Sequence, residues 1–424
     1  MLAGTPLVPF HGDEATQIFM SRDYAYQFLQ RDLSFITYSE HPTSPTEQHL
    51  RLINGTINKY LIGLAWHVGG FQLADINQQW DWGADWDYNQ HNDHAPTPQL
   101  LLTARWPSAL FLAAGVVVIF GLGRLLGGQL TGYLVSLYYA LNPVLLLNGR
   151  RAMMEGSAIF FGLLVVLAGV WFLQHRSWWT AALLGLSGGL ALASKHTTVF
   201  AVAGVFGVCI VATLVSPCQP VKHPTTKADS TNTKPFLNIQ RLSAASYPVV
   251  AILLMLLVFY LLNPAWWNNN PIVIGGEVLR LRQELLDVQA EVFGGYSGLS
   301  DRVAGFLRQT LIALPQYYEA PGWDAYIGDQ IDRYEASVWR GVSIGGSLPG
   351  AVALLGIISV GMWALIRDRT ISASIRWLMG IWVLMVTLPV LVLTPLEWQR
   401  YYLPVYPAIG LALGMSYLFR RLKR

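Results

Sequence analysis

Residues 101–123 read LLTARWPSALFLAAGVVVIFGLG, an apolar run with a single charged residue. A helix of this length rises 1.5 Å per residue and crosses the roughly 30 Å hydrocarbon core of a bilayer. Similar runs recur along the chain. The sequence predicts about nine membrane-spanning helices, near 101–123, 128–147, 156–174, 179–194, 197–215, 246–263, 347–366, 377–395 and 402–419.

The composition agrees with these runs. Of the 424 residues, 53% are hydrophobic and only 12% are charged, and the mean hydropathy is +0.39. Soluble globular proteins carry roughly 25% charged residues, so that class is excluded. Disorder is excluded as well, because apolar residues are abundant and the net charge is only +3. We therefore expect an all-α polytopic membrane protein, since a bilayer offers backbone groups no partner outside a helix.

The runs divide the chain into four parts. Residues 1–100 are an expected outer-face loop, and residues 101–263 hold spans interrupted by a cytoplasmic linker at 216–245. Residues 264–345 are a second outer-face loop, and residues 346–424 hold the last spans. Apolar residues recur at spacings of three and four from Val278 to Val292, which predicts an amphipathic helix in the second loop.

The positions of Lys and Arg predict the orientation, because short cytoplasmic loops are enriched in them. One set of loops holds thirteen cations and only two acids, Asp229 and Asp368, a balance of +11; the remainder of the chain is at −8. The cations of that set are Arg124, Arg176, Lys222, Lys227, Lys234, Arg241, Arg367, Arg369, Arg376, Arg420, Arg421, Lys423 and Arg424. We place this set and the C-terminus in the cytoplasm of a cell-membrane protein, and both large loops outside.

Nine spans with a cytoplasmic C-terminus put Met1 outside. No basic segment followed by an apolar core precedes the first loop, so the sequence shows no signal peptide. We therefore expect a further span upstream of Met1.

Charged residues gather at the outer ends of the predicted spans. They are Asp13 and Glu14, the turn with Arg150, Arg151 and Glu155, the pair Lys195 and His196, and Arg400. Ionisable groups at a membrane boundary are costly and often functional, although each one could instead extend to the lipid headgroups.

Acids and cations gathered at one membrane boundary suit one kind of reaction. Outside a cell no nucleotide donor is expected, so a group transfer there uses a donor carried by lipid, such as a polyprenyl phosphate sugar. Arg and Lys stabilise the charge that develops on the leaving phosphate. A carboxylate such as that of Asp13 can take the proton of the attacking hydroxyl.

The motifs also resemble those of a known family. They are Gly12-Asp13-Glu14-Ala15, Arg151-Ala152-Met153-Met154-Glu155, Gly189-Leu190-Ala191 leading to Lys195, and Arg400-Tyr401-Tyr402-Leu403-Pro404. In order and spacing the chain resembles the GT-C membrane glycosyltransferases, specifically the phospholipid-carrier-dependent enzymes related to protein O-mannosyltransferases (glycosyltransferase family 39) and to the bacterial aminoarabinose transferase. The resemblance implies a GT-C-like fold.

The predicted site combines both lines of reasoning. Asp13 is the expected base, and Glu14 orients it or binds the acceptor. Arg151, Lys195 and Arg400 are expected to hold the donor phosphate, together with Arg150 and Lys59. Glu155, which we expect to fix Arg151, supports the site with His196 and Tyr401.

Two features leave alternatives open. Near Lys59 the chain reads Asn54-Gly55-Thr56-Ile57-Asn58-Lys59, where the family has other segments, so the acceptor and any metal stay undefined. His11 and His196 could ligate a divalent metal, and no other cofactor is expected. Asp85-Trp86-Asp87 imitates the metal-binding pair of soluble glycosyltransferases, but an ordinary loop is the favoured interpretation.

We therefore expect a transferase that moves mannose or a related hexose or pentose from a polyprenyl phosphate to an acceptor hydroxyl of a protein, lipid or glycan, with inversion at the anomeric carbon. Membrane lipids are the other expected partners, and no nucleic acid is. The alternatives are a transporter or lipid flippase, in which we would expect related halves and mid-membrane breaks, and a structural subunit without activity.

Overall fold

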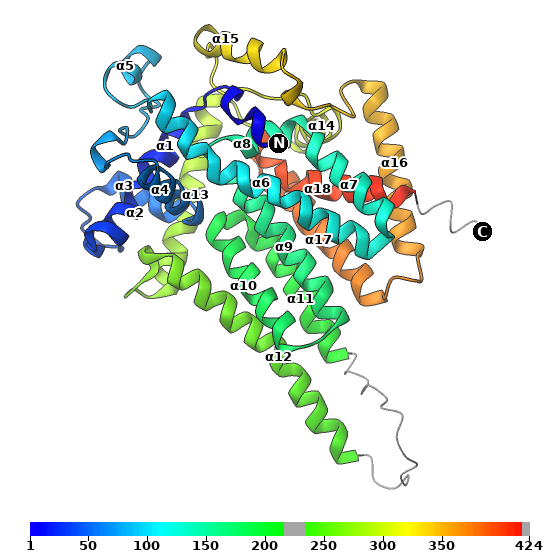
Figure 1. The fold of residues 1–424 in the computed structure, drawn as a ribbon. Coiled ribbons are helices and arrows are strands. Elements are labelled where there is room, and N and C mark those ends of the chain that lie inside the picture. Colours follow the sequence, from blue (N-terminus) through cyan, green and yellow to red (C-terminus); the bar gives the residue numbers. More distant parts are fainter. Residues whose placement is uncertain (216–233, 418–424) are drawn as a thin grey trace.

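The computed structural model describes residues 1–215 and 234–417, which contain helices and turns but no strand (Figure 1). The N-terminal part contains α1 (Gly12–Met20), α2 (Arg22–Tyr24), α3 (Pro45–Ile53), α4 (Ile57–Val68) and α5 (Trp86–His91). The next part contains α6 (Pro98–Gly127), α7 (Gln129–Leu141), α8 (Pro143–Arg150), α9 (Glu155–Gln174), α10 (Trp178–Ser194), α11 (Val199–Val215) and α12 (Lys234–Leu262). The last part contains α13 (Pro271–Phe293), α14 (Leu299–Leu307), α15 (Asp324–Glu335), α16 (Leu348–Arg367), α17 (Ala373–Leu393) and α18 (Tyr406–Ser416).

Every predicted span is helical over most of its length, but the count of nine is not confirmed. In the described part of the chain, five helices are long and apolar enough to cross a membrane: α6, α9, α11 with the preceding turn, α16 and α17. The helices at 178–194 and 403–416, and the part of α12 at 246–262, are apolar over shorter lengths. By length and composition, the described residues thus contain five candidate spans, or six if α7 and α8 are counted as one span.

The prediction of one continuous span at 128–147 was wrong in one respect. Helices α7 and α8 meet at a 60° bend between Asn142 and Pro143. A residue before proline avoids the helical conformation. Here Asn142 is extended, and its side-chain oxygen accepts hydrogen bonds from the first N–H groups of α8. The bend brings Arg150 and Arg151, at the end of α8, next to the N-terminal helices.

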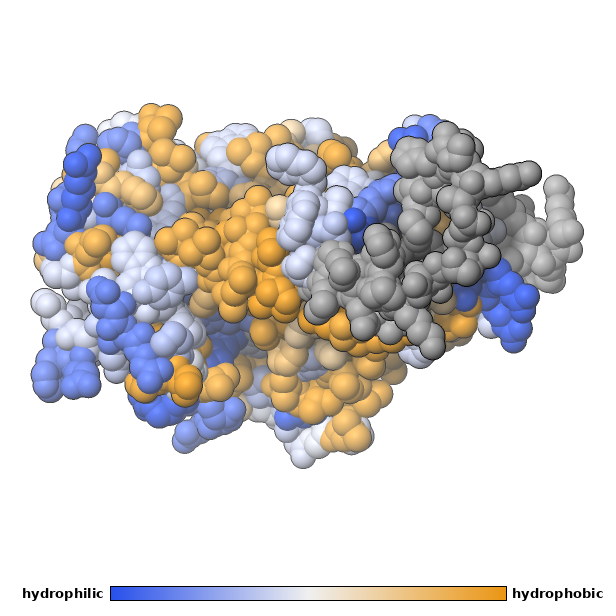
Figure 2. Space-filling model, turned by 90° about the horizontal axis from the view of Figure 1, so that it is seen from below, coloured by the Kyte–Doolittle hydropathy of each residue, from blue (hydrophilic) through white to orange (hydrophobic). Residues whose placement is uncertain are grey.

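Helix α9 lies at the centre of the bundle. In its apolar window 72% of the residues are buried, compared with 28% in α16 and α17. It packs against α6, α10, α11 and α17. The outer helices leave large apolar side chains exposed, such as Val117, Leu253 and Val352. Figure 2 shows hydrophobic residues gathered over the middle of one face, with hydrophilic residues beside them. Such a surface is what contact with lipid requires.

The expected loops are structured. The predicted amphipathic helix is confirmed as α13, in which Leu281 is buried while Val288 and Val292 are exposed. Helix α12 begins at Lys234, inside the predicted linker 216–245, while residues 216–233 lie outside the described part of the chain. Helices α5 and α15 lie together at one end of the molecule (Figure 1), and their aromatic rings stack, with Trp86 and Tyr326 5.0 Å apart.

Candidate active site

A cavity of about 450 Å³ lies where α1, α3, α9, α13 and the segments around residues 80, 319 and 400 meet. Its ionisable lining residues are Asp13, His49, Glu155, Lys195, Arg282, Glu319, Arg400 and Tyr401. The apolar lining residues include Leu285, Val288, Val292 and Phe293 of α13. One cavity thus combines acids and cations with an apolar wall.

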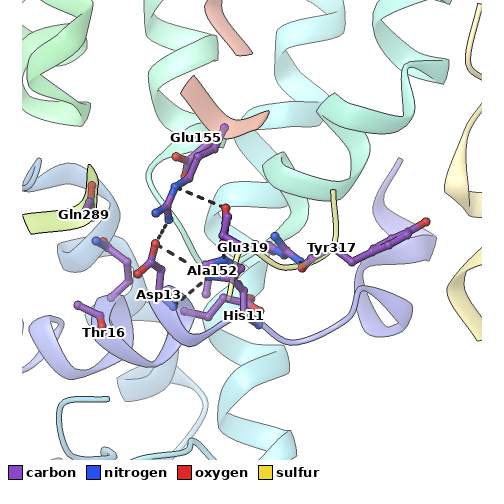
Figure 3. Close-up of polar contacts among 12 residues, drawn as sticks. His11, Asp13, Thr16, Ala152, Glu155, Gln289, Tyr317 and Glu319 are labelled. Carbon is purple, nitrogen blue, oxygen red and sulfur yellow. Dashed lines mark hydrogen bonds and ion pairs between the residues drawn. The ribbon is translucent and has the colours of Figure 1, made fainter. Parts of the chain in front are cut away.

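The start of α1 positions Asp13. His11 is the N-cap residue, and its ring nitrogen Nδ1 accepts a hydrogen bond from the Asp13 N–H at 3.1 Å. Glu14 completes the cap by accepting from the His11 N–H at 3.2 Å. Asp13 therefore lies on the first turn with its side chain 27% exposed, and it forms an ion pair with Arg400 (Figure 3).

Arg400 joins two acids. Besides Asp13, its Nε lies 3.8 Å from Glu319 Oε1, and its guanidinium lies 4.7 Å above the ring of Trp398. Glu319 also contacts His11 Nε2. Because His11 Nδ1 accepts a hydrogen bond, Nε2 is the nitrogen that carries the proton and donates to Glu319. Burial lowers the pKa of His11, which favours this neutral form.

Glu155 and Lys195 form the second charged pair of the cavity. Lys195 Nζ donates to Glu155 Oε1 at 2.8 Å, and Glu155 Oε2 has no partner among the described residues. The structure thus pairs Glu155 with Lys195, not with Arg151 as expected. Arg151 lies behind the cavity wall, 1% exposed, and donates to the Tyr317 carbonyl at 2.6 Å. Burial lowers its pKa.

Glu14 is buried beneath Asp13 and does not line the cavity. Its carboxylate accepts from Arg105 Nε at 2.8 Å and Nη2 at 2.7 Å, and from the Ala152 N–H at 2.8 Å. Burial opposes ionisation, but the Arg105 guanidinium outweighs it and lowers the pKa of Glu14. Glu14 therefore connects α1 to α6 and to the turn that follows α8.

Three other predicted residues also lie away from the cavity. Arg150 donates to the Met1 and Trp339 carbonyls, both at 2.7 Å. Lys59 is buried and pairs with Asp23 at 2.5 Å. His196 lies in the turn η5 (His196–Thr198), and its Nε2 has no partner among the described residues. Of the predicted residues, Asp13, Glu155, Lys195, Arg400 and Tyr401 line the cavity.

Sequence reasoning missed Arg105, Glu319 and Arg282 as residues of this site. Arg105 carried a usable signal, because a charge within an apolar span requires an acidic partner. Arg282 lies within the predicted amphipathic helix, but nothing in its sequence pattern distinguished it from the other charged residues there. It is half-buried in the cavity wall and, among the described residues, forms no ion pair or hydrogen bond. Nothing in the sequence around Glu319 indicated a role.

The described residues contain no group of three or more His, Cys, Asp and Glu side chains arranged to hold a metal ion. His11 contacts Glu319, and His196 does not line the cavity. Asp85 caps α5, where its side chain accepts from the Tyr88 N–H at 2.7 Å. We therefore assign no set of metal ligands among the residues that the structure describes.

A family model described as dolichyl-phosphate-mannose-protein mannosyltransferase matches residues 49–271, more than half of the chain. The chain belongs to this mannosyltransferase family. The match runs from within α3 to just past the end of α12, and it includes the turn with Arg151 and Glu155 and the end of α10 at Lys195. Family membership disfavours the transporter alternative.

Two solved structures share the fold of this mannosyltransferase-family chain. Both are ArnT from Cupriavidus metallidurans, in the apo state and bound to undecaprenyl phosphate. Each has a TM-score of 0.50, with 15% and 16% identity, covering 95% and 98% of this chain. The alignments cover 54% and 57% of ArnT, so the chain spans about half its length. They confirm the predicted GT-C-like fold. Curated protein sequences give no match.

Proposed function

We propose that this protein transfers a sugar from a polyprenyl phosphate carrier to an acceptor hydroxyl. The observation that carries the proposal is one cavity in which Asp13 lies beside the cations Lys195, Arg282 and Arg400, with the apolar wall of α13 next to them. A lipid phosphate needs both a cationic and an apolar surface. Family membership and the undecaprenyl phosphate bound by ArnT support a polyprenyl-linked donor.

In this reaction the acceptor oxygen attacks the anomeric carbon and its proton passes to the Asp13 carboxylate. The bond from that carbon to the phosphate oxygen breaks, and both electrons stay on the phosphate. Attack opposite the leaving group inverts the anomeric carbon. The positive charges of Lys195, Arg282 and Arg400 stabilise the phosphate as its negative charge grows.

Arg282 is the strongest candidate for the first phosphate contact. Lys195 and Arg400 are already paired with carboxylates, so a phosphate must compete for them. Arg282 has no such partner among the described residues, and its charge is available without breaking an ion pair. The donor sugar is mannose or a related hexose or pentose, and the cavity opens on the extracytoplasmic face, as the distribution of Lys and Arg suggests.

The test measures release of radiolabelled sugar from polyprenyl phosphate mannose, and from a panel of related donors, by the full chain in lipid nanodiscs. We expect Asp13→Asn to lower turnover by about 10²–10⁴-fold, the usual contribution of a general base. Arg282→Gln should raise the donor KM.

Arg280→Gln is the matched control. Arg280 lies two residues before Arg282 on α13. Its side chain is 53% exposed and pairs with Glu277 and Glu284 outside the cavity. It should behave as the unaltered protein does. Near-normal turnover of Asp13→Asn, or equal effects of the two Arg substitutions, would overturn the assignment.

A further inference from the structure

An exposed tryptophan lies beside Asp13 at the cavity. Trp82 lines the cavity and is 45% exposed. Its ring stacks on Trp323 with centroids 5.6 Å apart and planes at 12°. A Cβ atom at Gly12 would lie only 2.8 Å from the Trp82 ring and 3.1 Å from that of Trp323. The protein thus fixes the orientation of this ring while leaving much of its surface open.

A row of neutral polar side chains follows Asp13 along the cavity. Thr16 and Gln17 lie three and four residues later, on the same face of α1 as Asp13. Gln79 Nε2 donates to Thr16 Oγ1 at 3.0 Å, and Gln17 Nε2 donates to Asn54 Oδ1 at 3.4 Å. Figure 3 labels Asp13 and Thr16 on this helix. All of these residues line the cavity.

This row has unused hydrogen-bonding capacity. Within the described part of the chain, the amide oxygens of Gln17 and Gln79 accept no hydrogen bond. Gln17 is only 4% exposed, so water does not readily satisfy its oxygen. A buried acceptor without a partner costs stability, and a ligand hydroxyl placed there would remove that cost.

We propose that Trp82 and the row formed by Thr16, Gln17, Asn54 and Gln79 make an acceptor subsite for a sugar ring. The acceptor of the proposed reaction is then a carbohydrate hydroxyl. A sugar ring presents an apolar C–H face, which packs on an aromatic ring, and hydroxyls that both donate and accept, as amides and the Thr hydroxyl do. This inference rests on the proposed function and narrows its acceptor.

The proposed acceptor subsite and the cations proposed to bind the donor phosphate lie on different sides of the cavity. Trp82 packs on Trp323, which comes just before α15, at the end of the molecule where α5 and α15 lie (Figure 1). Lys195 follows the end of the apolar helix α10, and Arg282 is on α13, which supplies the apolar wall. A lipid-linked phosphate fits the Lys195 and Arg282 side. The ring beside Trp82 is then the acceptor.

A Ser or Thr peptide fits this subsite less well. An extended peptide needs partners for successive backbone N–H and C=O groups, which recognition sites commonly supply from the edge of a sheet. The described residues contain no strand.

The test uses the full chain in nanodiscs with labelled polyprenyl phosphate sugar, and offers short oligosaccharides and Ser/Thr peptides as acceptors. We expect transfer to oligosaccharides. Trp82→Ala should raise the KM for the oligosaccharide about tenfold and leave the donor KM unchanged, and Trp82→Phe should restore most of the affinity. Gln17→Leu, which keeps the volume, should also raise the acceptor KM. Trp179→Ala is the control, because Trp179 is 86% exposed and does not line the cavity.

Transfer to peptides but not to oligosaccharides would overturn the inference and leave the proposed function standing. So would a Trp82→Ala variant whose donor KM rises as much as its acceptor KM. If no donor is consumed, even with water as acceptor, the proposed function fails. The inference is then decided by binding alone: NMR saturation transfer from the protein to free oligosaccharide must be present in the unaltered protein and lost in Trp82→Ala and Gln17→Leu.

Discussion

Replacing Glu14 with Gln tests whether this acid is a positioning residue. The carboxylate is fully buried, and Arg105, its partner, is 3% exposed. Glu14→Gln keeps the shape but places an amide NH₂ against one of the Arg105 N–H donors, which lie 2.7 and 2.8 Å from the carboxylate oxygens. The contacts from the His11 and Ala152 N–H groups compete for the one remaining oxygen.

The expected loss of stability follows from the burial of the Glu14–Arg105 pair. Removing one member of a buried ion pair leaves the other charge uncompensated, which costs about 3–5 kcal/mol. Glu284→Gln is the matched control, because Glu284 and its partner Arg280 are each 53% exposed. Exposed pairs contribute little to stability.

The assay is thermal unfolding of both variants in the same detergent. We expect Glu14→Gln to lower the melting temperature several times more than Glu284→Gln. The double variant with Arg105→Met should recover part of the loss, since residues in one contact are not additive. A melting temperature of Glu14→Gln equal to that of the control, with turnover abolished, would refute the positioning role and restore Glu14 as a catalytic residue.

Three further predictions concern the charged pairs. Arg400→Gln should raise the donor KM in the nanodisc assay, and an unchanged KM would remove Arg400 from the phosphate site. Lys195→Met should lower the melting temperature by leaving Glu155, 3% exposed, without its cation; adding Glu155→Gln should recover stability but not donor affinity. Because burial lowers the pKa of His11, the unfolded chain binds more protons below pH ~6.5. The difference between the melting temperature of the unaltered protein and that of His11→Gln should therefore be constant above pH ~6.5 and should decrease as the pH falls to 5.5. An increase of this difference at low pH would contradict a neutral His11.

Helix positions could be predicted from the sequence because a long apolar run has one favourable conformation in a bilayer. The bend at Pro143 was missed, although the sequence carried a signal for it, since proline disfavours a helical conformation of the residue before it. The number of membrane-spanning helices could not be predicted from the sequence. Whether the helix at 178–194, with 17 residues, or the one at 403–416 crosses the bilayer depends on tilt and on its neighbours, not on its own residues.

The site was predicted only in part, for a physical reason. Asp13, Lys195 and Arg400 belong to short motifs whose chemistry is visible in one sequence. Glu319 reaches His11 across 308 residues, and such a contact depends on how the helices pack. Local sequence likewise cannot say that Lys59 pairs with Asp23 and is absent from the cavity.

Under the proposed function, the charge balance of the cavity connects the proposed base, Asp13, to the donor. Its acids and cations are nearly matched: Asp13 lies with Arg400, Glu155 with Lys195, and Glu319 with His11 and Arg400. A carboxylate held by a guanidinium is a poor base, because accepting a proton would break the ion pair. Under the proposed function, a donor phosphate competes with Asp13 for Arg400. As the phosphate takes up this cation, the carboxylate becomes available to the acceptor hydroxyl. On this proposal Asp13 becomes a stronger base only when the donor is in place, and the contact between Asp13 and Arg400 within one cavity is the arrangement that such coupling requires.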